Sequence, residues 1–211
     1  MKKVAVIVPT LDVSKAMKYV GKSLEGLPVK VVYKLDVYKN VSKTRNKGAE
    51  EEKDSDILFF IDDDVEILPE AFMEWVARLE DDERNVIWNE QPMILGIHRN
   101  KFLQTGGFDE RIPFMSEDIE LDYVLKKMER KGLVKILSIE PRTYVHHSSK
   151  AYAEKKRWLN EKHSVYTFLV HDKRRLLHAP KRYQDGLKVF IMRYFWLIWA
   201  IYKLLFFKRR S

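Results

Sequence analysis

The stretch ILFFIDDDVEILPEAF at residues 57–72 decides how the chain is expected to fold. It begins with an apolar run at 57–61 and continues with three acids, Asp62, Asp63 and Asp64. A short apolar run of this kind is typical of a buried strand in a parallel sheet. In open α/β sheets, ligands bind beyond the carboxyl ends of the strands, so the three carboxylates are predicted to lie at a ligand-binding edge.

The acidic triplet offers oxygen ligands for a divalent cation. Side chains alternate along a strand, so Asp62 and Asp64 are expected to face the same way and Asp63 the opposite way. Two carboxylates on one face suit Mg²⁺ or Mn²⁺, which proteins hold with one or two carboxylates and substrate phosphates. The alternative is a solvated acidic turn before a helix that begins at Pro69. The buried strand in front of the triplet favours the metal site.

Further apolar runs alternate with helical patterns, which predicts an α/β fold. Strands are expected at 3–8, 29–33, 57–61, 133–139 and, shorter, at 142–149. Helices are expected at 14–24, 42–53, 69–79 and 99–105, and from residue 117 to the glycine at 132. Residues 85–95 are expected to form a strand and a loop.

The composition bounds the class of protein. The 211 residues are 45% apolar and 33% charged, which is typical of one globular domain with an appendage. The chain has no cysteine, which excludes disulfides, thiolate catalysis and cysteine-type zinc sites. Residues 150–211 hold 16 Lys and Arg against 4 Asp and Glu, whereas residues 1–149 hold 23 against 27. We therefore expect a catalytic domain at 1–150 and a basic, aromatic helical tail at 151–211.

The tail contains the run VFIMRYFWLIWAIYKLLFF at 189–207. Arg193 and Lys203 interrupt it, so an interfacial helix is the easier interpretation, although a span with both cations snorkelling and a packed helix remain open. The cations at 208–210 would add attraction to anionic lipid. The sequence therefore predicts a membrane surface as partner for residues 189–210. It also predicts a location at the cytoplasmic side of the membrane, either peripheral or with a single C-terminal anchor.

Polar residues follow the expected strands or begin the expected helices. Thr10 and Asp36 follow the first and second strands, and His146 lies near the end of the last one. Lys43 and Arg45 stand at the start of a helix, where cations oppose the helix dipole unless an anion is present. These positions predict a site for a nucleotide diphosphate, and the alternative is that the two cations point into water.

At this point the chain resembles glycosyltransferase family 2, whose members have the GT-A fold, a Rossmann-like and mostly parallel sheet flanked by helices. The matching pieces lie in the family's order within residues 3–150: VAVIVPT at 4–10, TRNKGAE at 44–50, LFFIDDDVEILPEAF at 58–72, GGFDERIPFMSEDIEL at 106–121 and VHHSS at 145–149. The resemblance implies inverting hexosyl transfer from a UDP-, GDP- or dTDP-sugar to a hydroxyl of a glycan or lipid-linked acceptor.

The resemblance also implies roles for single residues. Asp118 matches the catalytic base, and Asp62 and Asp64 match the metal motif. His146 matches a position that contacts the diphosphate or its metal, with His147 as a rival. Residues implied to contact the donor, or expected to from their positions, are Pro9, Thr10, Asp36, Lys43, Arg45, Asp62 and Asp63. Asp36 stands a residue or two away from the acid with which the family reads the nucleotide base, because the usual pair of acids is absent after the second strand.

Two other functions remain open from the sequence. A basic nucleic-acid-binding protein or a non-catalytic scaffold could act through the tail, which mixes cations with aromatic residues. The first 149 residues are net acidic and show no nucleic-acid module, so we expect no nucleic-acid partner. The sequence leaves open whether the chain forms a homodimer.

Overall fold

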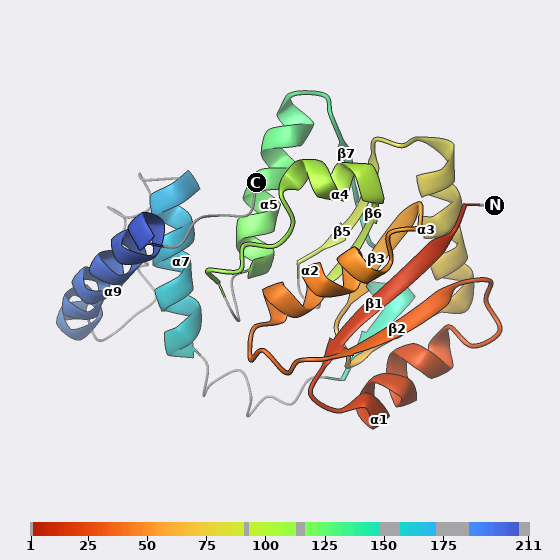
Figure 1. The fold of residues 1–211 in the computed structure, drawn as a ribbon, viewed down its shortest axis with the longest axis horizontal. Coiled ribbons are helices and arrows are strands. Elements are labelled where there is room, and N and C mark those ends of the chain that lie inside the picture. Colours follow the sequence, from red (N-terminus) through yellow and green to blue (C-terminus); the bar gives the residue numbers. More distant parts are fainter. Residues whose placement is uncertain (1, 91–92, 113–116, 148–156, 172–185, 207–211) are drawn as a thin grey trace.

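The computed structural model describes residues 2–90, 93–112, 117–147, 157–171 and 186–206. Six strands form a central sheet in the order β2-β1-β3-β6-β5-β7 (Figure 1). Their bounds are Val4–Thr10 for β1, Lys30–Leu35 for β2, Ile57–Ile61 for β3, Asn85–Asn89 for β5, Ile94–His98 for β6 and Lys135–Ser138 for β7. Two further strands, β4 (Val65–Ile67) and β8 (Tyr144–His146), form a separate antiparallel pair.

Strand β6 was not predicted and is the one described strand that makes the sheet mixed. It runs antiparallel to both β3 and β5, whereas the other pairings within this sheet are parallel. Gly96 interrupts its apolar pattern, and a β-carbon at this position would meet Phe59 Cε1 at 2.4 Å. The glycine therefore allows the ring of Phe59 to pack directly on the β6 backbone.

Helices cover both faces of the sheet. One face is covered by α1 (Val13–Ala16), its π-helical continuation η1 (Met17–Gly21) and α3 (Pro69–Asp81). The other is covered by α2 (Val41–Glu51), α4 (Arg99–Thr105) and α5 (Glu117–Arg130). A short 3-10 turn, η2 (Pro141–Thr143), leads into β8. The observed bounds confirm the predicted α/β class and differ from the predicted helices by a few residues at their ends.

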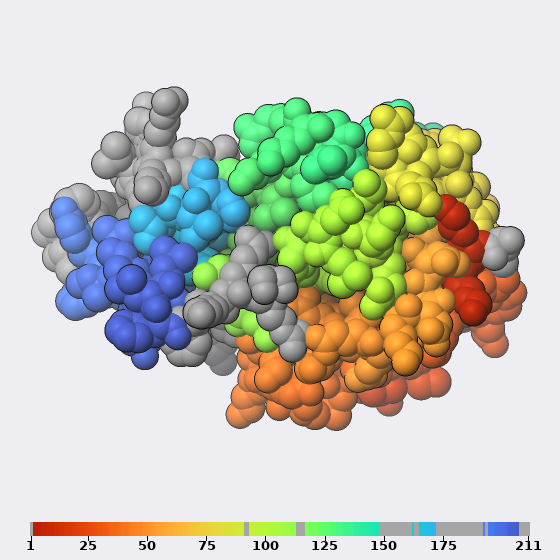
Figure 2. Space-filling model, turned by 45° about the horizontal axis from the view of Figure 1, so that its top comes forward, coloured from red at the N-terminus to blue at the C-terminus, as the bar shows by residue number. Residues whose placement is uncertain are grey.

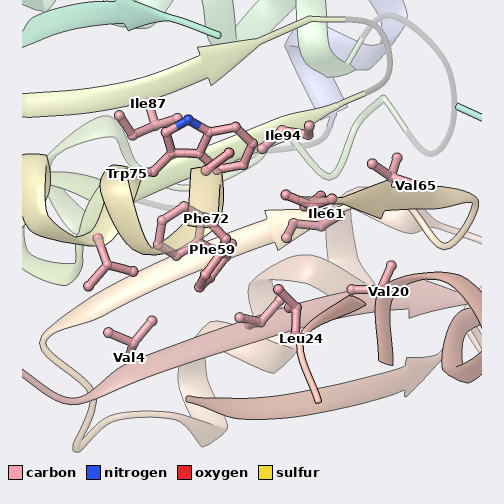
Figure 3. Close-up of a cluster of buried hydrophobic side chains, with 14 of the residues drawn as sticks. Val4, Val20, Leu24, Phe59, Ile61, Val65, Phe72, Trp75, Ile87 and Ile94 are labelled. Atoms are coloured by element: carbon pink, nitrogen blue, oxygen red, sulfur yellow. The ribbon is translucent and has the colours of Figure 1, made fainter. Parts of the chain in front are cut away.

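Alternation along the buried strands divides the core into two clusters. Val6 and Phe59 point to the side of α1 and α3, whereas Ile7 and Phe60 point to the side of α2 and α4. In the first cluster, the rings of Phe59 and Phe72 lie against each other (Figure 3), with 4.6 Å between their centroids. Both strand faces are apolar because both are covered, which explains the uninterrupted apolar run at 57–61.

Two helices of the predicted tail lie together at one end of the molecule (Figure 1). They are α7 (Arg157–His171) and α9 (Gly186–Phe206), and α7 also packs against α5. The predicted domain boundary near residue 150 lies outside the described residues. Within the described part of the chain, no helix is sufficiently long and apolar to span a bilayer.

Candidate active site

The end of β1 is joined to the acidic triplet by a hydroxyl and an ammonium group. Thr10 is buried, and its Oγ1 donates to Asp63 Oδ2 at 2.5 Å. Asp12 caps α1 by accepting from the Ser14 backbone, which holds Lys15 in the first turn of the helix. Lys15 Nζ then lies 2.7 Å from Asp63 Oδ1. This geometry gathers one cation and the triplet at the carboxyl end of the parallel strands.

Lys15 also reaches the next carboxylate of the triplet. Its Nζ lies 3.2 Å from Asp64 Oδ2. Partial burial lowers the pKa of Lys15, but the hydrogen bonds and charges of Asp63 and Asp64 outweigh this effect, so the pKa lies above its ordinary value. Lys15 is therefore a charged ammonium group that already balances two carboxylates of the site.

The expected alternation of the three aspartates is wrong. Strand β3 ends at Ile61, and Asp62 to Asp64 belong to the following turn. Consequently Asp63 and Asp64 share Lys15, whereas Asp62 is bound elsewhere: its Oδ1 accepts from Arg45 and its Oδ2 from the Met93 backbone. The rule of alternating sides holds only while the backbone is extended.

Arg45 is the buried centre of a second cluster. Its side chain is 2% exposed and bridges Asp62 Oδ1 at 2.7 Å and Glu117 Oε1 at 2.9 Å. Burial raises the pKa of Asp62, and the guanidinium of Arg45 acts in the opposite direction. The predicted contact of Arg45 with a phosphate stays a prediction, but two carboxylates of the chain already occupy this cation. Among the described residues, Arg45 Nε has no hydrogen-bond partner.

Asp118 begins α5 directly after Glu117 and is partly buried. Burial and the negative charge of Glu117 raise its pKa to about 7, with smaller contributions from Glu90 and Asp62. The Ile119 backbone amide donates to Asp118 Oδ1 at 2.8 Å and acts against this shift. A carboxyl group with a pKa near neutrality, beside a carboxylate-rich edge, can act as a general base at physiological pH.

Two residues that were predicted to contact the donor, Asp36 and Lys43, have partners near the start of α2. Asp36 Oδ1 accepts from Thr44 Oγ1 at 2.6 Å and from the Asn40 backbone at 3.1 Å. Lys43 Nζ lies 4.4 Å from the centroid of the Tyr38 ring. Their predicted roles at the nucleotide remain predictions. Pro9 is buried within β1 beside Thr10.

A carboxylate and an imidazole lie together at the triplet. Pairing of β4 with β8 places His146 opposite Val65, and its Nε2 lies 3.3 Å from Asp64 Oδ1. The neighbouring His147 instead stacks on Tyr19 at 4.2 Å between ring centroids. Carboxylate oxygens are the ligands that Mg²⁺ and Mn²⁺ prefer, so Asp64 is the principal candidate ligand of such an ion and His146 a neighbour that could add a nitrogen donor.

The described residues provide an incomplete set of ligands for such an ion. In this part of the chain, no group of three or more His, Asp and Glu side chains is arranged to hold a metal. Two donors fit a cation whose remaining ligands are water and substrate phosphates, which is how Mg²⁺ is usually held. Asp64 and His146 therefore fit a divalent metal as partial ligands. Both oxygens of Asp64 are contacted in this structure, by Lys15 and His146, as both oxygens of Asp62 are by Arg45 and the Met93 amide.

The loop that leads toward Asp118 is fixed from two sides. Asn46 of α2 accepts from the Phe108 backbone amide and donates to the Phe108 carbonyl, both at 2.9 Å. Gly107 has φ +72°, and a β-carbon there would meet Asn46 Oδ1 at 2.8 Å. On the other side, the Tyr166 hydroxyl of α7 donates to Asp109 at 3.0 Å. The tail thus completes a loop of the first 150 residues.

Sequence reasoning missed two participants of the site. Lys15 gave no signal, because a lysine in an amphipathic helix is ordinarily a solvent-exposed residue. Tyr166 lies 57 residues after its partner Asp109, so no local pattern connects them. Asn46 lies inside the quoted stretch TRNKGAE, but its contact with residue 108 could not be read from spacing.

Sequence comparison identifies neither a protein family nor a curated protein that matches the chain. Structure comparison does find similar folds. GalNAc-T7 with UDP, GalNAc and Mn²⁺ has a TM-score of 0.59 at 14% identity, over 98% of this chain and 57% of that chain. The present chain thus spans little more than half of that protein.

Glucosyl-3-phosphoglycerate synthase from Mycobacterium tuberculosis is similar in two structures. In complex with Mn²⁺, UDP and phosphoglyceric acid, its TM-score is 0.59 at 14% identity, over 81% of this chain and 78% of that one. In complex with Mg²⁺ and UDP, the TM-score is 0.60 at 13% identity, over 82% and 80%. At such low identity these likenesses report on the fold, and membership of family 2 stays a prediction. The chain has the GT-A fold predicted from its motifs.

Proposed function

We propose that the protein is a metal-dependent glycosyltransferase that moves a hexosyl group, with inversion, from a nucleotide-diphosphate sugar to a hydroxyl of a glycan or lipid-linked acceptor. The observation that carries the proposal is the GT-A fold with Asp118 at the start of α5, close enough to the acidic triplet for the charge of Asp62 to act on it. The similar proteins add support, since they were solved with UDP and Mn²⁺ or Mg²⁺.

In this proposal, Asp118 accepts the proton of the acceptor hydroxyl while the hydroxyl oxygen attacks the anomeric carbon. The bond between that carbon and the diphosphate oxygen breaks from the opposite side, and its electron pair leaves with the diphosphate. A divalent cation, when bound, supplies positive charge to the leaving diphosphate. Asp64 and His146 would provide its protein ligands. Glu117 keeps the proton affinity of Asp118 high, and Arg45 fixes Glu117 in place.

Lys15 has a separate part in this scheme. In the structure its ammonium group balances Asp63 and Asp64. A metal with a donor diphosphate would bring both positive and negative charge to the same carboxylates. We therefore expect Lys15 to turn from the carboxylates to the diphosphate when both ligands are present, which would help to stabilise the leaving group.

Thermal unfolding with nucleotides tests the proposal directly. The full chain would be measured with UDP, GDP, dTDP and CDP, each with and without Mn²⁺. A ligand that binds only the folded state at a hundredfold excess over its Kd stabilises it by about 2.7 kcal/mol, which for a chain of this size raises Tm by roughly 5–10 °C. We expect one nucleotide, UDP, to give this shift, and only with the metal.

A matched control and a product assay complete the test. Asp64→Asn should abolish the metal-dependent shift. Asp82→Asn should leave it intact, because Asp82 is a partly exposed acid that pairs with Arg84. Absence of a shift with all four nucleotides would contradict the proposal. Because a nucleotidyltransferase would also bind nucleotide and metal, the released product must be a nucleoside diphosphate and not pyrophosphate.

A further inference from the structure

Helix α9 turns an apolar face to the solvent. Phe195, Ile198 and Leu205 have exposed fractions of 63%, 64% and 73%. These positions recur at helical spacing and share one side of the helix with further exposed apolar residues. We call this side the outer face of α9, which consists of Tyr194, Phe195, Ile198, Ile201, Tyr202, Leu205 and Phe206.

The opposite side of α9 already serves the fold. Trp196 and Ala200 are 6% and 0% exposed, and Ala200 packs with Tyr166 of α7 and Ile112. This inner side packs α9 against the rest of the described structure, and burial of the outer face is not needed for that packing. A contiguous apolar surface of this kind marks an interaction site.

The charge of the segment that contains α9 indicates the kind of partner. Residues 186–211 contain six Lys and Arg and no Asp or Glu. Three of these cations fall at 208–210, outside the described residues. Figure 2 shows α9 at the end of the molecule away from the N-terminus. An apolar face within a cationic segment that has no acids complements a lipid surface, which has an apolar interior and anionic headgroups.

We propose that the outer face of α9 lies in the plane of an anionic lipid surface. Phe195, Ile198 and Leu205 enter the boundary between headgroups and acyl chains, and the anionic headgroups attract the positively charged segment. Tyr194 and Tyr202 lie on the same side, and tyrosine is enriched at this level of membranes. Binding of lipid needs no sugar donor, so this proposal can fail or hold independently of the proposed function.

Flotation of the full chain with vesicles tests the proposal. Vesicles of phosphatidylcholine alone are compared with vesicles that contain about 30% phosphatidylglycerol, because cationic segments gain attraction from anionic lipid. The expected result is flotation with the anionic vesicles at low salt and much less with the neutral ones. Flotation should fall at about 1 M salt, where the Debye length shrinks to about 3 Å.

Two outer-face variants and one matched control assign the binding to α9. Phe195→Glu and Ile198→Glu are expected to lower the vesicle partition coefficient at least about tenfold, because each replaces apolar area that would be buried in the lipid by a negative charge. Leu103→Glu is the control, since Leu103 is a comparably exposed apolar residue on α4, at 57%. All three positions are exposed, so Tm should be unchanged, and a variant that fails this check is replaced by the other outer-face variant.

Three outcomes would overturn the proposal. The wild-type chain could remain unbound with anionic vesicles at low salt. The Ile198→Glu variant could float as well as the Leu103→Glu control, which would mean that the binding is unspecific charge attraction. The wild-type chain could also form a dimer that Ile198→Glu dissociates while no vesicle binds, and the outer face would then belong to an interface with a second copy.

Discussion

Lowering the pH from about 8 to about 6 is expected to reduce the rate of transfer about tenfold, because Asp118 must be ionised to accept a proton. Burial and the charge of Glu117 raise its pKa to about 7. A group with this pKa is roughly 90% ionised at pH 8 and roughly 10% ionised at pH 6. An aspartate at the ordinary value of 3.8 would remain ionised over this range, and the rate would not change.

The assay is the pH dependence of kcat/KM for the donor, which reports ionisations of the free enzyme, followed through release of the nucleoside diphosphate. Asp118→Asn should lower transfer by about 10²–10⁴-fold and preserve the nucleotide-induced rise in Tm, because the base acts on the acceptor. Asp82→Asn is the control, since it removes an acid that pairs with Arg84 and that the proposal gives no part in the reaction. The pH step must persist in this variant.

Two results would refute the reasoning. A flat profile between pH 6 and 8 in the wild-type chain would mean that the ionisation of Asp118 does not limit the reaction. Near wild-type transfer by Asp118→Asn would remove Asp118 from the chemistry altogether.

The remaining predictions concern stability and metal affinity. Between about pH 4 and 7, Asp118 is protonated in the folded state and ionised in the unfolded state, so the free energy of unfolding falls as the pH rises through this range. Asn cannot ionise, so the Tm of Asp118→Asn should rise relative to that of the wild type over the same range. Arg45→Met leaves two partly or fully buried carboxylates without their cation, a loss of about 3–5 kcal/mol, and should lower Tm by about 10 °C in calorimetry. Arg78→Met, which removes an exposed pair, should cost less than about 1 kcal/mol. Lys15→Met should bind Mn²⁺ about tenfold more tightly in titration calorimetry without nucleotide, because a competing cation is gone, whereas Lys18→Met should bind it like wild type.

Most elements of the fold could be predicted from local sequence patterns. Strands β1 and β3 are short apolar runs, and α2, α3 and α5 have helical spacing with recognisable starts or stops, so their existence could be predicted from neighbours in sequence. Strand β6 could not be predicted in this way, because a glycine such as Gly96 is typical of turns and loops. Its glycine is required by the ring of Phe59, which lies 37 residues away and belongs to another strand. Tertiary packing therefore decided this element.

The site was predictable in its parts and not in its pairings. Strand ends and helix starts led to Thr10, Asp63 and Asp118 because these positions are set by local structure. Arg45 was expected at a phosphate, since a cation at a helix start needs an anion. The structure places Glu117 beside Arg45, 72 residues later in the chain, and the phosphate contact stays a prediction. A pairing with so distant a side chain depends on topology, which single-sequence patterns do not contain.

The contact between α7 and the loop at 106–112 has a consequence for synthesis of the protein. Domains begin to fold from the N-terminus while the ribosome is still extending the chain. Asp109 accepts a hydrogen bond from Tyr166, which is translated 57 residues later, and Glu120 lies against His171, 51 residues later. The sheet can therefore assemble during translation, but the segment around Asp118 acquires these contacts only after α7 has left the ribosome. A stalled or shortened chain that lacks α7 would contain the sheet with its acidic triplet but not these contacts of Asp109 and Glu120 on either side of Asp118.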